Sequence, residues 1–193
     1  MAVKVLGIRG SPRRGGNSEM LLDSALAGAA SRGAEIEKLS ITDYRIAPCS
    51  NCDECRKTGQ CTIINDDMEI FYRKFATLDR LILATPIFFV SVPSLLKAMI
   101  DRCQSLWVAK YVLDRPIAEK SENRKGLFIA VGHRDKPREF EPAIAVAKVF
   151  FAILNVGYVG SLTYGGIEGK GEIVSHPTAL KEAFEAGAKL VDG

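Results

Sequence analysis

This sequence of 193 residues lacks the features of several large protein classes. No basic block supports binding to nucleic acid or to an anionic membrane surface, because the 26 Lys and Arg and the 23 Asp and Glu are spread along the chain. The longest uncharged run, residues 81–96, contains Pro86 and Pro93 and is too short to cross a bilayer. The first ten residues lack the apolar core of a secretory signal, so we expect a cytoplasmic protein with no membrane partner.

Apolar, strand-like runs alternate with helix-like stretches along the whole chain. No repeat or linker divides them, so we expect a single domain over residues 1–193. The expected strands are residues 3–8, 35–41, 80–84, 126–131 and 158–164, and the expected helices are 18–31, 67–77, 94–106, 143–154 and 178–191. Five strands that are each followed by a helix predict an α/β protein with a parallel, doubly wound sheet.

The strand order follows from the polarity of the expected strands. The first, third and fourth are continuously apolar, which is typical of strands covered on both faces, whereas the second and fifth include polar residues, as edge strands do. This pattern predicts the five-stranded order 2-1-3-4-5 of the flavodoxin-like fold. Ligands in this fold bind at the carboxyl ends of the strands, which directs attention to the loops at 9–17, 86–92 and 132–138.

The loop after the first strand, GSPRRGGNS at residues 10–18, is suited to a single phosphate group. It joins a strand to a helix, where backbone N–H groups and the positive helix end attract anions. It lacks the Lys and Ser/Thr of a nucleotide-binding P-loop, which disfavours an NTPase, and the G-x-G-x-x-G pattern of a dinucleotide site is also absent. The remaining donors are Ser11, Arg13, Asn17 and Ser18. The alternative is a glycine-rich turn without a ligand.

The five cysteines are few but unevenly placed, since four fall within residues 49–61. These four are Cys49, Cys52, Cys55 and Cys61. Their short gaps favour a [4Fe–4S] cluster, because structural zinc is usually bound by two more widely separated pairs. Zinc, free thiols and redox disulfides remain alternatives. Cys103 is far along the chain, and we expect it to be an inert or partly exposed helix residue.

Helix-end and helix-face patterns add several expectations. Asn17 is a candidate N-cap of the first helix, and Asp66 with Glu69 has the spacing of a capping box. The helix at 143–154 is apolar nearly all round, which is typical of either a deeply buried helix or a subunit interface.

Two features between the third and fourth strands leave alternatives open. Lys97, Asp101 and Arg102 share one helical face and form either an exposed ion pair or part of a subunit contact. Residues 107–125, which include the single Trp, are either an arm over a neighbouring subunit or a surface loop.

Three stretches together resemble the iron–sulfur flavoproteins of the flavodoxin-like NAD(P)H-dependent FMN reductase superfamily. They are GSPRRGGNSEMLL at 10–22, PCSNCDECRKTGQCTIINDDM at 48–68 and TPIFFVSVPSLLKAMIDR at 85–102. With the order of strands and helices, the resemblance extends over essentially the whole chain. It implies FMN, a [4Fe–4S] cluster on the four clustered cysteines of a loop at 48–66 after the second strand, and a homodimer or homotetramer.

The resemblance also implies how FMN lies in the protein. Its phosphate would be held by the first loop, on Ser11, Arg13, Asn17 and Ser18, and its isoalloxazine ring would lie against Pro86, Ile87, Phe88 and Phe89. The chemistry of the second loop agrees, because it offers backbone donors and flat apolar surface to a flavin. Family members often have Tyr where Phe88 stands, so any hydroxyl group there is absent.

The loop after the fourth strand begins with Gly132 and His133, on the same edge of the sheet. We include both as candidate cofactor contacts. His133 either contacts the flavin ring or a redox partner, or is a solvated loop histidine.

These features lead to the hypothesis of an FMN oxidoreductase that exchanges electrons between a ferredoxin-like carrier and its flavin through a [4Fe–4S] cluster. No acid, base or nucleophile constellation is evident, so the cofactors would carry the reaction. One alternative is an NAD(P)H-dependent FMN or quinone reductase whose cysteines hold no cluster or a structural zinc. Another is a flavin-binding module that senses redox state.

Overall fold

In the computed structural model, which describes residues 2–119 and 122–192, five strands form one parallel sheet of order β2-β1-β3-β4-β5, as predicted. The strands are β1 Lys4–Arg9, β2 Glu35–Ser40, β3 Arg80–Pro86, β4 Lys125–Val131 and β5 Gly157–Tyr164. In β1, β3 and β4, every residue except one at an end of the strand is buried. In β2 and β5, most residues are half-buried or exposed. The edge positions that the sequence predicts for the second and fifth strands are therefore confirmed.

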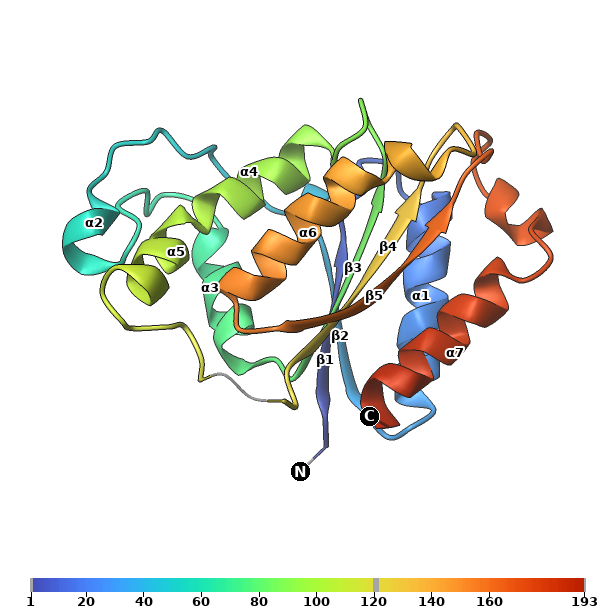
Figure 1. Ribbon diagram of the computed structural model, residues 1–193, viewed down its shortest axis with the longest axis horizontal. Helices are drawn as coiled ribbons and strands as arrows, with labels where there is room; N and C mark the ends of the chain where they lie inside the picture. The colour runs from blue at the N-terminus through green and yellow to red at the C-terminus, as the bar shows by residue number, and fades with distance from the viewer. Residues whose placement is uncertain (1, 120–121, 193) are drawn as a thin grey trace.

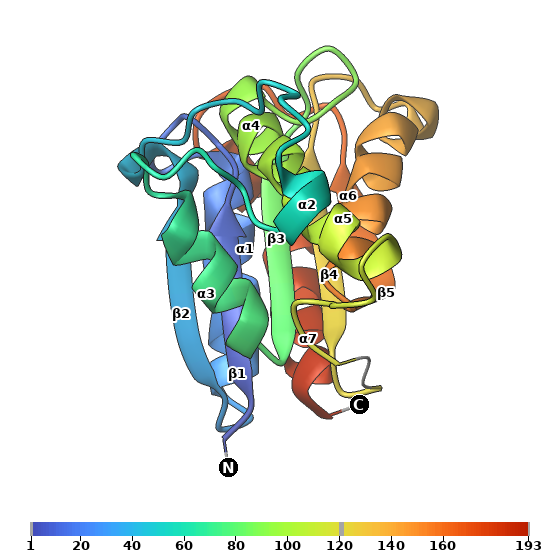
Figure 2. The ribbon, with the colours of Figure 1, turned by 90° about the vertical axis from the view of Figure 1, so that its left-hand side faces the viewer.

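Helices cover both faces of the sheet. In chain order they are α1 Asn17–Ala30, α2 Cys55–Thr58, α3 Met68–Thr77, α4 Ser94–Arg102, α5 Gln104–Tyr111, α6 Glu141–Ile153 and α7 Ala179–Asp192. Figure 1 shows α1 and α7 on one face and α3 to α6 on the other, and Figure 2 looks onto the second face. The short α2 lies outside these layers and packs beside α5. The arrangement is the flavodoxin-like fold.

Each face of the sheet has its own apolar core. On the face of α3 and α6, the rings of Phe75 and Phe150 meet edge to face with centroids 5.5 Å apart, and both side chains are fully buried. On the other face, α1 contributes Leu21 and Leu22 to a core shared with α7. Burial of each such side chain stabilises the fold by about 1.5–3 kcal/mol, so the two cores hold the strand ends in fixed positions.

The expected helix at 94–106 is wrong in one respect, because it is two helices that meet at Cys103. The Cys103 N–H bonds to the Ile100 carbonyl three residues back, which tightens the chain at this point. The Arg102 carbonyl accepts a hydrogen bond from the Tyr72 hydroxyl at 2.8 Å. Cys103 is fully buried rather than partly exposed, and burial raises the pKa of its thiol, as expected for an inert cysteine.

Two predicted helix caps are also wrong. Gly16, not Asn17, is the N-cap of α1, because Asn17 is the first helical residue and its side chain bonds elsewhere. Asp67 precedes α3 at the N-cap position, and Asp66 does not form a capping box with Glu69. The Asp66 carboxylate is instead held in a buried cluster of hydrogen bonds beside the cysteines.

Helix α6 is buried on one side only, and the described residues of 107–125 lie against their own chain, while the subunit contacts offered as alternatives for both segments stay predictions. One side of α6, including Ala147 and Phe150, is in the core, whereas Val149 is 61% exposed on the other side. Residues 107–111 complete α5, and residues 112–119 follow the surface of the same chain, where the Ala118 carbonyl accepts a hydrogen bond from Asn155. Residues 120 and 121 of this segment lie outside the described residues.

Candidate functional site

Loops at the carboxyl ends of β1, β3, β4 and β5 surround a cavity of about 370 Å³, within the usual range for a small-molecule site. Eight of the ten candidate cofactor residues line it: Ser11, Arg13, Asn17, Ser18, Pro86, Ile87, Phe88 and His133. The fold thus brings together side chains from loops that are more than a hundred residues apart in the sequence. Ile167 and Glu168 also line the cavity, and the sequence did not single them out.

The first loop offers an anion site with unused donors. Ser18 is 2% exposed, and its hydroxyl has no hydrogen-bond partner among the described residues. Arg13 is exposed, and no ion pair engages it in the part of the chain that the structure describes, whereas Arg14 pairs with Asp43 at 2.6 Å. The first turn of α1 adds backbone N–H groups that cannot bond within the helix. Arg13 and Ser18 could therefore bind a phosphate group.

The shape of this loop is held by a charged cluster beneath it. The Gly15 N–H donates to Glu19 at 2.7 Å, and Glu19 is paired with Arg9 at 3.0 Å and Lys38 at 3.2 Å. Partial burial alone would raise the pKa of Glu19, but these hydrogen bonds hold it below its ordinary value. Glu19 is thus an ionised carboxylate whose charge is compensated, and it fixes Gly15, whose φ of +62° is left-handed.

A second loop, after β5, closes over the first. The Asn17 amide donates to the Gly169 carbonyl at 2.8 Å and its oxygen accepts from the Ile173 N–H at 3.2 Å. A Cβ placed on Gly15 would lie 3.4 Å from Cε of Lys170, so this lysine lies over the glycine-rich turn. Asn17 therefore positions the neighbouring loop, and Lys170 adds a cation near the anion site that no sequence motif indicated.

The loop after β3 forms a tight, strained projection, visible above the sheet in Figure 2. Phe88 and Ser91 exchange two backbone hydrogen bonds, of 2.9 and 3.0 Å, around a turn in which Phe89 and Val90 have φ values of 49° and 57°. Such values cost about 1–2 kcal/mol for each non-glycine residue. Phe88 lines the cavity, but Phe89 is fully exposed at the tip and does not.

The loop after β4 places Gly132 and His133 differently. Gly132 is buried, its N–H donates to the Tyr164 carbonyl, and its own carbonyl accepts from the Ile167 N–H, so it does not line the cavity. His133 lines the cavity and is 67% exposed, with Nδ1 2.6 Å from Oε1 of Glu168. His133 is thus a solvent-exposed residue at the rim of the cavity.

The cavity suits FMN in two respects. Its β1 side offers a phosphate group the Ser18 hydroxyl and the Arg13 guanidinium, the first without a hydrogen bond and the second without an ion pair among the described residues. Its β3 side offers Pro86, Ile87 and Phe88 to a flat apolar ring. These observations concern the protein's own side chains, and they agree with the chemistry of both ends of FMN.

The four clustered cysteines line one small cavity beside α5, together with Gln104. All four are free thiols. Among the described residues, no three His, Cys, Asp or Glu side chains stand in ligating geometry. The donor set still fits a cluster in kind, because all four thiols line the same cavity, and burial first and then the other three cysteines raise the pKa of Cys55. Four thiols in one cavity are the ligands that iron–sulfur clusters use.

Two aspartates that follow the cysteine segment form hydrogen bonds with the backbone that precedes it. The Ala47 N–H donates to Asp66 at 2.9 Å, and the Arg45 N–H donates to Asp67 at 2.7 Å. Gly59, at a left-handed φ of 77°, ends α2 so close to α5 that an added Cβ would lie 3.0 Å from the Ala109 side chain. Residues 48–66 therefore contact α5 and are held at both ends by hydrogen bonds.

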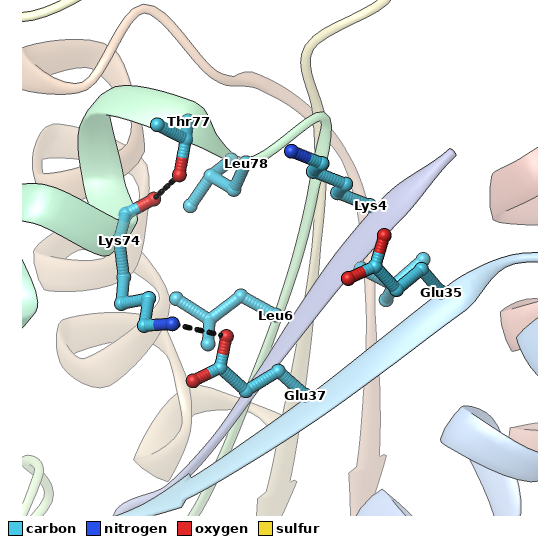
Figure 3. A pocket seen from close by; sticks show the side chains of 8 residues that line it. Lys4, Leu6, Glu35, Glu37, Lys74, Thr77 and Leu78 are labelled. Atoms are coloured by element: carbon cyan, nitrogen blue, oxygen red, sulfur yellow. Dashed lines mark hydrogen bonds and ion pairs between the residues drawn. The ribbon is translucent and has the colours of Figure 1, made fainter. Parts of the chain in front are cut away.

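A third pocket lies at the opposite, amino end of the strands. Figure 3 shows its side chains, among which Lys74 pairs with Glu37 at 2.8 Å. The pocket has a volume of only about 110 Å³, and the charges of Lys74 and Glu37 within it neutralise each other. It therefore does not resemble a cofactor site. No helix in the described part of the chain is both long and apolar enough to cross a membrane.

A parallel 2-1-3-4-5 sheet with a phosphate-suited first loop and an apolar second loop defines the class of flavodoxin-like, flavin-binding proteins. The sequence profile of the NADPH-dependent FMN reductase family matches residues 3–162. The chain belongs to this family, and is accordingly an FMN-containing oxidoreductase.

Relatives found by sequence and by structure agree. An iron–sulfur flavoprotein of Methanocaldococcus jannaschii is 32% identical over 98% of this chain and 96% of its own length. One from Archaeoglobus fulgidus is 30% identical over 98% of this chain and 80% of its own. Among solved structures, the NAD(P)H:quinone oxidoreductase from Methanothermobacter marburgensis has a TM-score of 0.71 at 17% identity, covering 98% of this chain and 100% of that one. The structural likeness supports the fold, and the sequence matches support the family.

Proposed function

We propose that this protein is an FMN oxidoreductase that also binds a [4Fe–4S] cluster and exchanges electrons with a one-electron carrier of the ferredoxin type. The single observation that carries the proposal is the cavity lined by Cys49, Cys52, Cys55 and Cys61 on the same side of the fold as α4 and α5. The names of the relatives, which are iron–sulfur flavoproteins, support it. FMN, when bound, would exchange one or two electrons and the cluster one, so the pair can link one-electron and two-electron partners.

The chain's own residues would bind and orient these groups. Ser18, Arg13 and the first turn of α1 would bind the FMN phosphate, while Ser11 shapes the turn by accepting the Arg13 N–H at 3.1 Å. Pro86, Ile87 and Phe88 would contact the isoalloxazine ring and exclude water from one side of it. Asn17 would act indirectly, by holding the loop after β5 over the phosphate.

The N–H and hydroxyl groups around Cys52 would favour its ionised thiolate. The pKa of Cys52 is held below its ordinary value by the Glu54 backbone N–H and then by the Thr62 hydroxyl. Thiolates are the form that binds metal, so this arrangement prepares the loop for its ligand. We also propose a reducing, cytoplasmic compartment, in which these thiols stay available, and one FMN-binding domain over residues 1–193.

The test compares two routes of reduction in protein reconstituted anaerobically with FMN, iron and sulfide. Flavin reduction is followed at its visible absorption band, with either a reduced ferredoxin or NAD(P)H as donor. We expect Cys61→Ser to lose most of the ferredoxin route, whereas Cys103→Ala, a cysteine outside the cluster, keeps it. Equal ferredoxin rates in wild type and Cys61→Ser would contradict the proposal.

Membership of the NADPH-dependent FMN reductase family favours a second candidate, an NAD(P)H-dependent FMN or quinone reductase. In that case the cysteine loop would hold zinc or no metal. Rapid reduction by NAD(P)H, unaffected by Cys61→Ser and without any ferredoxin route, would identify this second function.

A further inference from the structure

Arg102, at the last position of α4, is the most deeply buried charged side chain beside the cysteine loop. Its side chain has 0% exposure, although the sequence suggested an exposed ion pair with Lys97 and Asp101. The exposed ion pair is confirmed for Lys97 and Asp101, which pair with each other on the surface at 2.7 Å, but Arg102 is buried and pairs with Asp66 instead. A buried guanidinium needs partners for its charge and its donors.

The partners of Arg102 lie on both sides of the cysteine run. Its terminal nitrogens donate to the Ala47 carbonyl at 3.0 Å, before Cys49, and to the Ile63 carbonyl at 2.8 Å, after Cys61. The same nitrogens pair with the Asp66 carboxylate at 2.5 Å, and that side chain is only 4% exposed. One guanidinium therefore joins the entry and the exit of the loop that contains the four cysteines.

The backbone of Arg102 is fixed as firmly as its side chain. The Tyr72 hydroxyl of α3 donates to its carbonyl, and Ser105 bonds to the same carbonyl at 3.3 Å. The break between α4 and α5 follows directly at Cys103. These contacts hold the guanidinium in one place, so it can impose a shape on the loop.

One hydrogen-bond donor of Arg102 is unsatisfied in the part of the chain that the structure describes. Its Nε is buried without a hydrogen-bond partner among the described residues. The guanidinium bonds to the Ile63 carbonyl only two residues after Cys61. Burial lowers the pKa of Arg102, but Asp66 and then Cys61 outweigh this and raise it. A buried cation with an unused donor suits a group that carries net negative charge on its sulfur atoms.

We propose that Arg102 is a positioning residue for the metal centre: it clamps both ends of the cysteine loop and places a buried positive charge beside Cys61. This inference rests on the proposed function for the kind of metal centre, but the clamp concerns the four thiols whichever metal they bind. Its positive charge would favour the reduced form of a cluster, because reduction adds one negative charge nearby.

Four variants separate the clamp from the charge. Arg102→Lys keeps the charge but cannot reach both carbonyls and Asp66 together, so we expect it to release iron to a chelator roughly 10- to 100-fold faster than wild type. Arg102→Gln leaves Asp66 uncompensated and should lower the cluster's reduction potential. Asp66→Asn leaves Arg102 uncompensated and should raise it. The double variant Asp66→Asn/Arg102→Gln should fall between them, and it avoids an unpaired buried charge if a single variant folds poorly.

Arg124 provides a matched control. It is also a buried arginine whose Nε has no partner in the described part of the chain, and it donates to the backbone carbonyls of Phe75, Leu78 and Leu154 at the other end of the sheet. Arg124→Lys should therefore perturb the fold in a similar way but leave iron release at the wild-type rate. FMN content, measured in every variant, should remain at the wild-type level because Arg102 does not line the FMN cavity.

The outcomes are distinct. Faster iron release in Arg102→Lys alone, with potentials that move in opposite directions in Arg102→Gln and Asp66→Asn, supports the inference. Wild-type release and an unmoved potential in all Arg102 variants would overturn it, as would equal acceleration in Arg124→Lys. If wild type binds zinc and no iron, the proposed cluster is wrong. The role of Arg102 as a clamp is then tested by the rate of zinc release, which should be faster in Arg102→Lys than in wild type. An unchanged rate would overturn that role.

Discussion

Replacing Arg13 by Gln should weaken FMN binding through the phosphate group alone. Arg13 is exposed and free of ion pairs among the described residues, and it lines the cavity beside the first turn of α1. A charge pair at about 4 Å contributes roughly 1 kcal/mol in water and about 4 kcal/mol near a protein surface. Because Arg13 is solvated, we take about 1–2 kcal/mol, which corresponds to a Kd roughly 5- to 30-fold higher.

The assay measures the Kd of the apoprotein for FMN and for riboflavin, which lacks the phosphate, by quenching of flavin fluorescence. Arg13→Gln should change only the Kd for FMN. Arg14→Gln is the matched control, because Arg14 is next in the chain but already pairs with Asp43, and its affinity for FMN should stay at the wild-type value. An equal loss in both variants, or an equal loss for riboflavin and FMN in Arg13→Gln, would refute the assignment of the phosphate to this loop.

Four shorter predictions address other parts of the molecule. Ser18→Ala should weaken FMN binding by about 1 kcal/mol without changing the melting temperature of the apoprotein, since its hydroxyl has no partner among the described residues. Burial would raise the pKa of Asp66, but the Arg102 side chain and two backbone N–H groups hold it below its ordinary value. The free energy of unfolding should therefore fall as the pH drops below about 4, and Asp66→Asn, less stable by about 3–5 kcal/mol at pH 7, should lose part of this dependence. Val90→Gly should stabilise the apoprotein by about 1 kcal/mol in chemical denaturation, by relieving the left-handed turn, and an unchanged midpoint would contradict that strain. Of the five thiols in reduced apoprotein, four should react rapidly with a disulfide reagent and Cys103 slowly, and five fast thiols would contradict its burial.

Much of the fold follows from local patterns in the sequence. Continuous apolar runs identify β1, β3 and β4 as interior strands, and the diluted runs identify β2 and β5 as edges, so the strand order is predictable. Each observed strand begins and ends within two residues of its predicted position, as do all the predicted helices except the one broken at Cys103. The first loop and the cysteine run are equally visible, because their spacing is a property of a short segment.

The features that the sequence did not reveal depend on contacts between distant residues. Arg102 and Asp66 are 36 positions apart, and Asn17 meets Gly169 across 152 positions, so no periodicity or spacing links them. The position of Lys170 over Gly15 is of the same kind. The break at Cys103 also depends on a distant partner, since Tyr72 of α3 bonds to the carbonyl where α4 ends. Propensity predicts one continuous helix there, and tertiary contacts override it.

The most direct test of the proposed function is the metal and flavin content of protein purified under strict anaerobic conditions. Iron, acid-labile sulfide, zinc and FMN are quantified per chain together with the visible absorption spectrum. The four thiols around one cavity predict about four irons, about four sulfides and one FMN per chain. Zinc, or no metal after reconstitution with iron and sulfide, would contradict the cluster, and failure to bind added FMN would contradict the cofactor site itself.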